Sequence, residues 1–569
     1  MKSKKLLAQI AAFSLVFGMT GVVSSWADEI ILDGTTVKFP NDAISLVKNE
    51  DGSFTVNNQD VKGVWLQNGS KLTANHVNFI NGGKGSSEIS VDNRSTLTVN
   101  GGSIDSDQDA FNVNDGSKAE VNEAKVTTGA WANNAAITLK DSTTSGHWLY
   151  AGNAFPDPEI ENDKGPVKEG LPVGSITIDG GTASVKNVLV QNKGQFNVTN
   201  GAVLDVTKDT SAIDSEIEQS ATGIKKGGEI VVRAWGPNTA WAEKENNDTI
   251  TNLKQVSTLA VNGATVKANK LTVEGKEAKK LNYSESAAFT AKNNSAVVLD
   301  SAVLNRAKFY AENSQISIGD LHADNNSQFL ANNGTKAEIQ KMTMDNGSVL
   351  GVGSYGKVAD VTVHQLDMKG NSTIAIENGQ LNSDQITMEK STIEIAGVGT
   401  LIANKMTLNN TSLSLSGIQN NIDTRALIQP LDVTQKGVTV EVKDTLAMNG
   451  GTLQVNDGSK LTTNQMKLTN GSTVTVDGTN SSYTIKGTDN TVSGDAKIDV
   501  INGGSVTLAK GAGIKAEAGT DNKVKTIITA DDCSTVKLEK GSSLYIANAK
   551  KGDTVPVSYT HLTLPTKLE

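Results

Sequence analysis

The sequence predicts an all-β chain, built as a single long right-handed parallel β-helix that two irregular insertions interrupt. A unit of about 20 residues recurs along the 569-residue chain, which is the first observation behind this prediction. Within each unit, short pairs of apolar residues are separated by one polar residue, and turns rich in asparagine and glycine separate the pairs. The clearest pairs are Ile374/Ile376, Ile386/Met388, Ile393/Ile395, Met406/Leu408 and Leu413/Leu415.

A spacing of two residues places both apolar side chains of a pair on the same face of a strand. The intervening turns, such as Asn470-Gly-Ser472 and Asn502-Gly-Gly504, contain residues that tolerate a positive φ. A strand this short cannot bury its apolar face alone, but it can do so if each coil of the chain stacks on the previous one. Coils of about 20 residues therefore predict a β-helix, and 20 to 25 coils at about 4.8 Å each would measure on the order of 100 Å.

Two other folds fit the repeat less well. A string of β-sandwich domains also has short strands and frequent turns, but sandwiches have longer strands and aromatic cores. Aromatic residues make up only 4% of this chain, and its apolar pairs are short and aliphatic. A helical solenoid is disfavoured because the repetitive region has no apolar period of 3.6 residues.

The N-terminus has the pattern of a secretory signal, with Lys2, Lys4 and Lys5 before an apolar stretch and small residues at Ser25 and Ala27. An uncleaved membrane anchor is the alternative. The chain is acidic, with a formal net charge of −10, which argues against nucleic acid as a partner. Its single cysteine, Cys533, excludes an intramolecular disulfide, as in many exported bacterial surface proteins.

The last residues break the repeat. The segment from Val557 to Glu569 resembles the translation of an adapter used to prepare DNA sequencing libraries, and we expect it to be an artefact. We therefore expect the natural gene to continue beyond Pro556, and a natural tail is the alternative. The predicted organisation is a signal peptide (1–27), coils (28–126), an insertion rich in proline and aromatic residues (127–173), coils (174–207), a second insertion (208–253), coils (254–556) and the artefact (557–569).

The repeat units resemble those of one known family. Asn100-Gly-Gly-Ser-Ile104, Asn449-Gly-Gly-Thr-Leu-Gln-Val455, Asn470-Gly-Ser-Thr-Val-Thr-Val476 and Asn502-Gly-Gly-Ser-Val-Thr-Leu508 are similar to repeats in the passenger region of bacterial autotransporters of the pertactin-like or AIDA-like adhesin type. The resemblance covers most of residues 28–552 and implies an exported, cell-surface protein. It also implies a C-terminal β-barrel that anchors the passenger in the outer membrane. That region would belong to the missing part of the gene.

A carbohydrate-active enzyme is the main alternative to this interpretation, because some β-helix proteins are polysaccharide lyases or glycoside hydrolases. Such sites need acidic and basic residues clustered in one groove. Asp105-Ser-Asp-Gln-Asp109 faintly resembles the acidic motif of pectin-type glycosidases, and Gly146-His147-Trp148 only partly matches a second motif. Arg306-Ala-Lys308 matches a third by letter, but it lies about ten coils away. We therefore predict that the chain is not an enzyme and needs no cofactor.

The same acidic triplet is a weak candidate for a calcium site, because the oxygens of Asp105, Asp107 and Asp109 could converge on a hard cation. An EF-hand loop would need glycine and glutamate at its sixth and twelfth positions, where this chain has Ala110 and Gly116. A solvated acidic turn is the alternative interpretation.

Aromatic residues concentrate in the two predicted insertions and are the best candidates for ligand binding. Exposed tryptophan and tyrosine rings can stack on sugars or anchor protein contacts. The alternative is that these rings pack the insertions against the coils. The candidate residues are Trp131, Trp148, Tyr150, Trp235 and Trp241.

The predicted function is that of a non-enzymatic adhesin or stalk at the cell surface. A stiff stack of coils would hold loops away from the cell, where weak contacts add up through multivalency. The expected partners are glycans or proteins of a host surface or of neighbouring cells, and self-association is a further expectation. A carbohydrate-active enzyme and an architectural surface-layer protein remain the alternatives.

Overall fold

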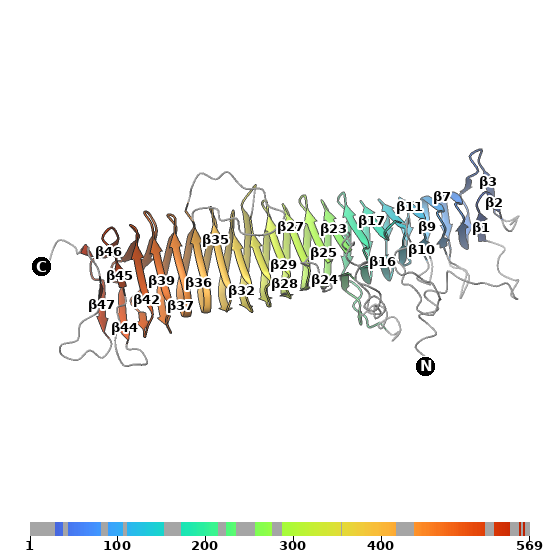
Figure 1. Cartoon of the computed structure of the whole chain (residues 1–569). Coiled ribbons are helices and arrows are strands. Elements are labelled where there is room, and N and C mark those ends of the chain that lie inside the picture. Colours follow the sequence, from blue (N-terminus) through green and yellow to red (C-terminus); the bar gives the residue numbers. More distant parts are fainter. Residues whose placement is uncertain are drawn as a thin grey trace, which may run out of the picture. The chain divides into compact units, whose positions relative to one another are not determined.

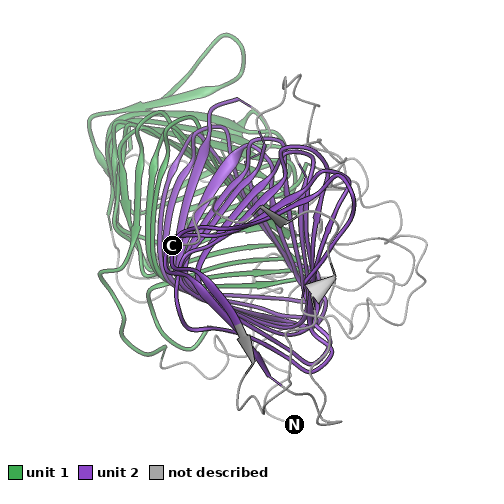
Figure 2. Cartoon of the chain, turned by 90° about the vertical axis from the view of Figure 1, so that its left-hand side faces the viewer, with its two compact units in different colours: residues 1–309 green, residues 310–569 purple. Residues whose placement is uncertain are grey.

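The computed structural model describes residues 29–37, 44–80, 89–105, 111–152, 172–213, 224–234, 257–275, 287–353, 356–416, 437–517, 528–546, 557–558 and 562–563. These residues divide into unit 1 (Met1–Phe309) and unit 2 (Tyr310–Glu569), which Figure 2 colours green and purple. Every regular element among them is a β-strand. No helical segment of the described residues is long and apolar enough to cross a bilayer.

The strands of unit 1 vary in length from two to ten residues, and Figure 1 shows them side by side along the chain. They are β1 (Glu29–Asp33), β2 (Thr36–Val37), β3 (Leu46–Lys48), β4 (Phe54–Asn57), β5 (Asp60–Val61), β6 (Gly63–Gln67), β7 (Lys71–Phe79), β8 (Ile89–Val91), β9 (Thr96–Ile104), β10 (Phe111–Asn114), β11 (Lys118–Asn122), β12 (Lys125–Val126), β13 (Ala130–Asn133), β14 (Ala136–Lys140), β15 (Thr143–Thr144), β16 (Trp148–Gly152), β17 (Ser175–Asp179), β18 (Thr182–Ser184), β19 (Asn187–Gln191), β20 (Gln195–Thr199), β21 (Val203–Val206), β22 (Glu229–Arg233), β23 (Ser257–Asn262), β24 (Thr265–Glu274), β25 (Ala287–Lys292) and β26 (Ala296–Asn305).

Strand β27 (Lys308–Glu312) contains the boundary, and unit 2 has the longest strands. They are β28 (Gln315–Asp324), β29 (Gln328–Asn332), β30 (Lys336–Met344), β31 (Val349–Val352), β32 (Ala359–Lys369), β33 (Thr373–Ile376), β34 (Gly379–Glu389), β35 (Thr392–Ala396), β36 (Thr400–Ser416), β37 (Thr439–Asn456), β38 (Lys460–Thr469), β39 (Thr473–Asp477), β40 (Ser482–Ile485), β41 (Asn490–Ser493), β42 (Lys497–Ile501), β43 (Ser505–Leu508), β44 (Gly513–Glu517), β45 (Ile528–Ala530), β46 (Thr535–Leu538), β47 (Ser543–Ile546), β48 (Val557–Ser558) and β49 (Leu562–Thr563).

Parallel pairing dominates both units. A strand typically pairs with the strand that follows it by two or three positions in chain order, as β14 does with β17 and β34 with β36. The chain therefore returns to the same ladder after about one sequence repeat. Antiparallel pairing occurs in two short N-terminal hairpins, β1 with β2 and β3 with β4. These pairings confirm the prediction of an all-β chain dominated by parallel strands.

The apolar residues of successive repeats lie in register. In unit 2, Leu381, Leu401 and Val440 are consecutive partners on β34, β36 and β37, and none of the three is exposed to solvent. The pairs that define the repeat align in the same way: Ile374 pairs with Ile393, and Ile393 pairs with Leu413. The core of each unit therefore consists of columns of aliphatic side chains that run across the strands.

Polar columns accompany the apolar ones at the strand ends. In unit 1 the side chains of Asn57, Asn75, Asn100 and Asn122 form a ladder of amide hydrogen bonds with donor–acceptor distances of 2.8, 2.9 and 3.0 Å. The turns contain the expected positive φ angles, for example 52° at Asn470 and 73° at Gly471. Asparagine thus serves two purposes here, because it forms turns together with glycine and its side-chain amide links one repeat to the next.

The structure corrects the bounds of both predicted insertions. Residues 130–152, which were assigned to the insertion at 127–173, form β13 to β16 in parallel register with neighbouring strands. The four prolines on which the predicted insertion depends all follow Gly152, whereas Trp131, Trp148 and Tyr150 lie on strands. Likewise, Glu229–Arg233, within the predicted insertion at 208–253, forms β22 and pairs with β19 and β24. Residues 1–28, which include the predicted signal, lie outside the described residues, as do residues 153–171 and 235–256.

Candidate functional site

A row of large side chains crosses β13, β16, β19 and β22 in unit 1. Trp131, Tyr150, Leu189 and Val231 are consecutive register partners on these strands. The alternate residues of the strands, such as Leu149, belong to the aliphatic columns. The ring centroids of Trp131 and Tyr150 are 5.1 Å apart with an interplanar angle of 42°. This tilted geometry lies within the range of distances that aromatic pairs favour. The row is thus a second apolar layer on the other face of the same strands.

An arm of the chain packs on this row. Residues 209–213 and 224–228 form its two sides and are joined by an antiparallel bridge between Ala212 and Lys226. Ile213 and Ile224 from the arm are buried in one cluster with Trp148, Tyr150, Leu189 and Val231. As a consequence, Trp148 is only 3% exposed and Tyr150 only 5%.

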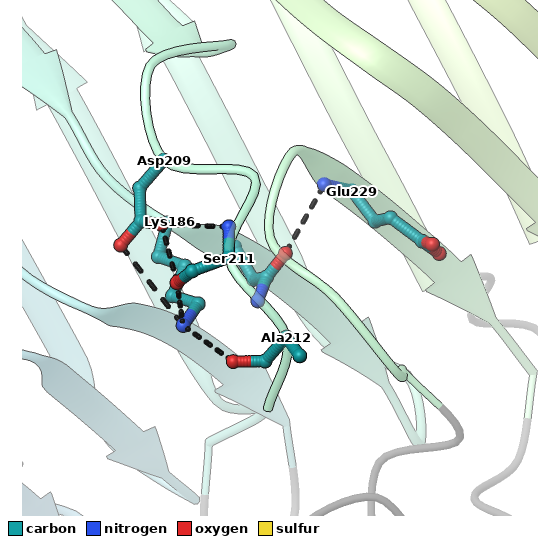
Figure 3. A network of polar contacts seen from close by, with 6 residues as sticks. Lys186, Asp209, Ser211, Ala212 and Glu229 are labelled. Atoms are coloured by element: carbon teal, nitrogen blue, oxygen red, sulfur yellow. Dashed lines mark hydrogen bonds and ion pairs between the residues drawn. The ribbon is translucent and has the colours of Figure 1, made fainter. Parts of the chain in front are cut away.

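Lys186 ties the arm to the strands (Figure 3). Its Nζ donates hydrogen bonds to Ser211 Oγ (2.7 Å) and to the carbonyl oxygen of Ala212 (3.3 Å), and it lies 4.0 Å from Asp209 Oδ2. The Lys186 side chain is only 12% exposed, whereas that of Asp209 is 45% exposed. A shielded ammonium group with several acceptors is a stronger tie than an ordinary surface ion pair.

We expect Lys186→Met to loosen this arm. A hydrogen bond to a charged group contributes about 1.5–3 kcal/mol, so local opening of residues 209–213 and 224–228 should become about tenfold more frequent. Hydrogen–deuterium exchange should detect this as faster exchange of the Ile213 amide, which donates to the carbonyl oxygen of Lys225 (3.0 Å). Lys208→Met is the matched control because the Lys208 side chain is 70% exposed and lies outside the arm. Equal exchange in both variants would contradict the role of Lys186.

A buried polar group lies beside the aromatic row. Arg233 Nε and Nη2 both donate to Gln191 Oε1, at 2.9 and 2.7 Å, and Gln191 Nε2 donates to Tyr150 Oη at 3.3 Å. Burial lowers the pKa of Arg233 to about 10, so the guanidinium remains charged at neutral pH. Burial also raises the pKa of Tyr150 to about 12, so the phenol stays protonated. On the other side of the row, Lys270 Nζ lies 3.3 Å from Glu229 Oε2.

The structure separates the five aromatic candidates. Trp148 and Tyr150 are buried beneath the arm, so neither ring is open to stack on a sugar. Both rings instead pack a segment of the chain against the strands, which was the alternative interpretation of these residues. Trp131 is half-buried at the edge of the same cluster. Its Nε1 atom is buried and has no hydrogen-bond partner among the described residues. Trp235 and Trp241 lie outside the described residues.

The acidic triplet is described only in part. Asp105 is exposed and accepts a hydrogen bond of 2.6 Å from Thr127 Oγ1, whereas Asp107 and Asp109 lie outside the described residues. Within the described part of the chain, no group of three histidine, cysteine or acidic side chains could hold a metal ion. The calcium site therefore stays a prediction.

Sequence reasoning missed Lys186, Gln191 and Arg233. One signal could have pointed to them. Three segments contain continuous apolar runs, whereas most strands alternate. Two of these segments, Asn187-Val-Leu-Val-Gln191 and Glu229-Ile-Val-Val-Arg233, have polar ends, and the third is Trp148-Leu-Tyr-Ala-Gly152. A continuous run indicates a strand covered on both faces, so that its polar ends must find partners within the structure.

Unit 2 contains a separate ionisable group on its surface. His364 Nδ1 lies 2.7 Å from Asp384 Oδ2, and His364 Nε2 lies 3.6 Å from Glu338 Oε1. Asn404 Nδ2 donates to the other oxygen of Asp384 at 2.9 Å. These residues come from four successive long strands, so the histidine bridges neighbouring repeats.

The pKa of His364 is expected to lie above its ordinary value of 6.5, chiefly because of the hydrogen bond to Asp384. A raised folded-state pKa means that the contribution of this histidine to stability is fully present below pH 6.5. That contribution is lost as the pH rises through the folded-state pKa. Titration of the His364 ring followed by NMR checks the direction. Asp384→Asn should return the pKa toward 6.5, and an unchanged pKa in that variant would refute the assigned cause.

Comparison of the chain with family models, with curated proteins and with solved structures found no match. The resemblance to autotransporter passengers therefore stays a prediction.

Proposed function

We propose that this protein is a non-catalytic display scaffold at a cell surface, in which each unit is a stretch of parallel β-helix. Support for the β-helix comes from the parallel pairing of strands two or three positions apart and from the aliphatic columns in register. A stack of this kind resists bending because every added coil extends the same ladders. A crystal structure in which the strands of a unit did not close around a common core would overturn this part of the proposal.

Rows of identical polar groups carry the functional proposal. In unit 2, Thr373, Thr392, Ser412, Thr452 and Thr473 are consecutive register partners on five neighbouring strand segments, and all lie on the accessible face. Adjacent parallel strands are about 4.8 Å apart, so these hydroxyl groups repeat at that spacing. Such a row offers many weak, equivalent contacts to a repeating partner, which is the arrangement from which multivalent attachment gains its strength.

The site geometry favours attachment over catalysis. The buried polar group of Arg233, Gln191 and Tyr150 is held together by hydrogen bonds among these three side chains and lies beside an apolar cluster. Its partners explain the positions of the three side chains without invoking a reacting substrate. The partners proposed for the scaffold are glycans or proteins of a neighbouring cell or a host surface, reached after export and retention at the outer membrane.

Attachment of beads coated with the full chain tests the proposal. Coated beads should adhere to epithelial cells or to bacteria that display the same chain, and adhesion should rise steeply with coating density because the contacts are multivalent. Beads coated with the heat-unfolded chain serve as the control. Release of reducing ends from polysaccharides, at a rate proportional to the amount of chain, would favour a carbohydrate-active enzyme instead. A failure of coated beads to adhere at any density would count against the scaffold.

A further inference from the structure

The aromatic row of unit 1 has one open end. Tyr150, Leu189 and Val231 are buried, partly beneath the arm, whereas Trp131, which precedes them in the row, is only half-buried. The next residue in the row is Asn112, the register partner of Trp131 on β10, and it is also half-buried. Counted from the arm, Trp131 is therefore the first ring of the row that solvent reaches.

Asparagine side chains surround this open end. Asn133 follows Trp131 by two residues on β13, and Asn114 is the register partner of Asn133 on β10. Asn133 Nδ2 donates to Asn114 Oδ1 at 3.1 Å, and Asn114 Nδ2 donates to Asp92 Oδ1 at 2.8 Å. These hydrogen bonds fix the orientation of both amides. Each amide has two donor hydrogens and an oxygen with two lone pairs, so Asn133 retains hydrogen-bonding capacity for a ligand.

We propose that Trp131, Asn112, Asn114 and Asn133 form a binding subsite for a neutral pyranose ring of a glycan. The indole offers a flat apolar face to the C–H face of the sugar, and the fixed amides bind its hydroxyl groups. Nε1 of Trp131 is buried without a hydrogen-bond partner in the described part of the chain, and residues that break a packing rule are expected to cluster at functional sites. This inference rests on the proposed scaffold function, and it names the class of ligand that the outward face of β10 and β13 would bind.

Charge selects a neutral sugar over an acidic one. The amide chain ends on the Asp92 carboxylate, which also accepts a hydrogen bond of 2.6 Å from Ser90 Oγ. Arg233, the buried cation of strand β22, already donates two hydrogen bonds to Gln191. A uronic acid would bring its carboxylate close to Asp92, and like charges repel.

Titration of the full chain with oligosaccharides tests the subsite. The probes are cellohexaose, maltohexaose and mannohexaose as neutral ligands, with hexagalacturonate as the acidic one, followed by calorimetry and saturation-transfer NMR. We expect at least one neutral probe to bind with a Kd in the millimolar range or below, and Trp131→Ala to weaken it by about tenfold or more. Asn133→Ala, which leaves the apolar row untouched, should weaken binding several-fold.

Trp65→Ala is the matched control. Trp65 lies in the same register row on β6, but its neighbours in the row are Ile31 and Ser90, and no asparagine flanks it there. Its replacement should leave binding unchanged. Trp131→Phe retains an aromatic ring and guards against a loss that only reflects unfolding, so this variant should keep most of the affinity.

Two results would overturn the subsite: no neutral probe binds the wild-type chain, or Trp131→Ala and Asn133→Ala bind as well as wild type. Adhesion of coated beads distinguishes the two proposals. If wild-type and Trp131→Ala beads adhere equally while no neutral probe binds, the scaffold stands and the subsite falls. If the probes bind as expected but beads never adhere, the subsite stands and the scaffold falls.

Discussion

Leu401→Ala is expected to lower the free energy of unfolding by about 2–5 kcal/mol, because it removes three heavy atoms from a fully enclosed position. Leu401 has Leu381 before it and Val440 after it in one aliphatic column. The backbone ladders on both sides hold the neighbouring strands at a fixed separation, so the column cannot collapse into the space left behind. The cavity term therefore adds to the lost burial of the side chain.

Urea unfolding followed by circular dichroism measures this loss. Ile402→Ala is the matched control, because Ile402 is the next residue on β36 and points to the other, partly exposed face. Its replacement removes a similar volume but should cost less than about 1 kcal/mol. If the two variants were equally destabilised, Leu401 and Ile402 would not lie on opposite faces, and the assigned register would be wrong.

Gly102→Ala is expected to destabilise unit 1 by about 3 kcal/mol or more, since it combines backbone strain with a collision. Gly102 has a φ of 82°, and a Cβ atom there would lie 2.1 Å from the carbonyl oxygen of Val77. Val77 is its register partner on β7. The colliding atom belongs to the backbone, so the strand itself must move for the methyl group to fit.

Gly201→Ala separates strain from collision. Gly201 has a similar φ of 77°, but a Cβ atom added there would have no neighbour within 4 Å. Its replacement should therefore cost only the left-handed strain, about 1–2 kcal/mol. Thermal unfolding of both variants by calorimetry measures the difference. Equal melting temperatures would show that the backbone of β7 does not approach Gly102 of β9 closely enough to collide with an added methyl group.

The sequence was informative about the strands of unit 2. The spacing of two within Ile374/Ile376 and Ile393/Ile395 correctly predicted which side chains face the core, and the distance between the pairs correctly predicted their register. Both properties are local, since one is the geometry of a strand and the other the length of one repeat. The inward face of a strand and the length of a repeat can therefore be predicted without knowing which segments pack together in the fold.

The aromatic site of unit 1 could not be predicted in the same way. Trp131, Trp148 and Tyr150 suggested an insertion that leaves the repeat, but they occupy the second face of ladder strands. Gln191 and Arg233 are 42 residues apart, and only the pairing of β19 with β22 brings them together. The arm that buries Trp148 and Tyr150 also follows them by about 60 residues in the chain, and no local pattern links the two.

Local patterns alone therefore specified strand type, inward face and repeat length, because alternation and turn chemistry act between residues a few positions apart. Tertiary structure decided which outward side chains meet, which rings are covered and which remain open to a ligand. A segment of any length can be inserted between two strands that pair in the same ladder. The local sequence of a strand therefore does not show which distant segment covers its outward face. The half-buried ring of Trp131 and the covered ring of Tyr150 are neighbours in one row, and Ile213 and Ile224 of the arm pack in the cluster that buries Tyr150.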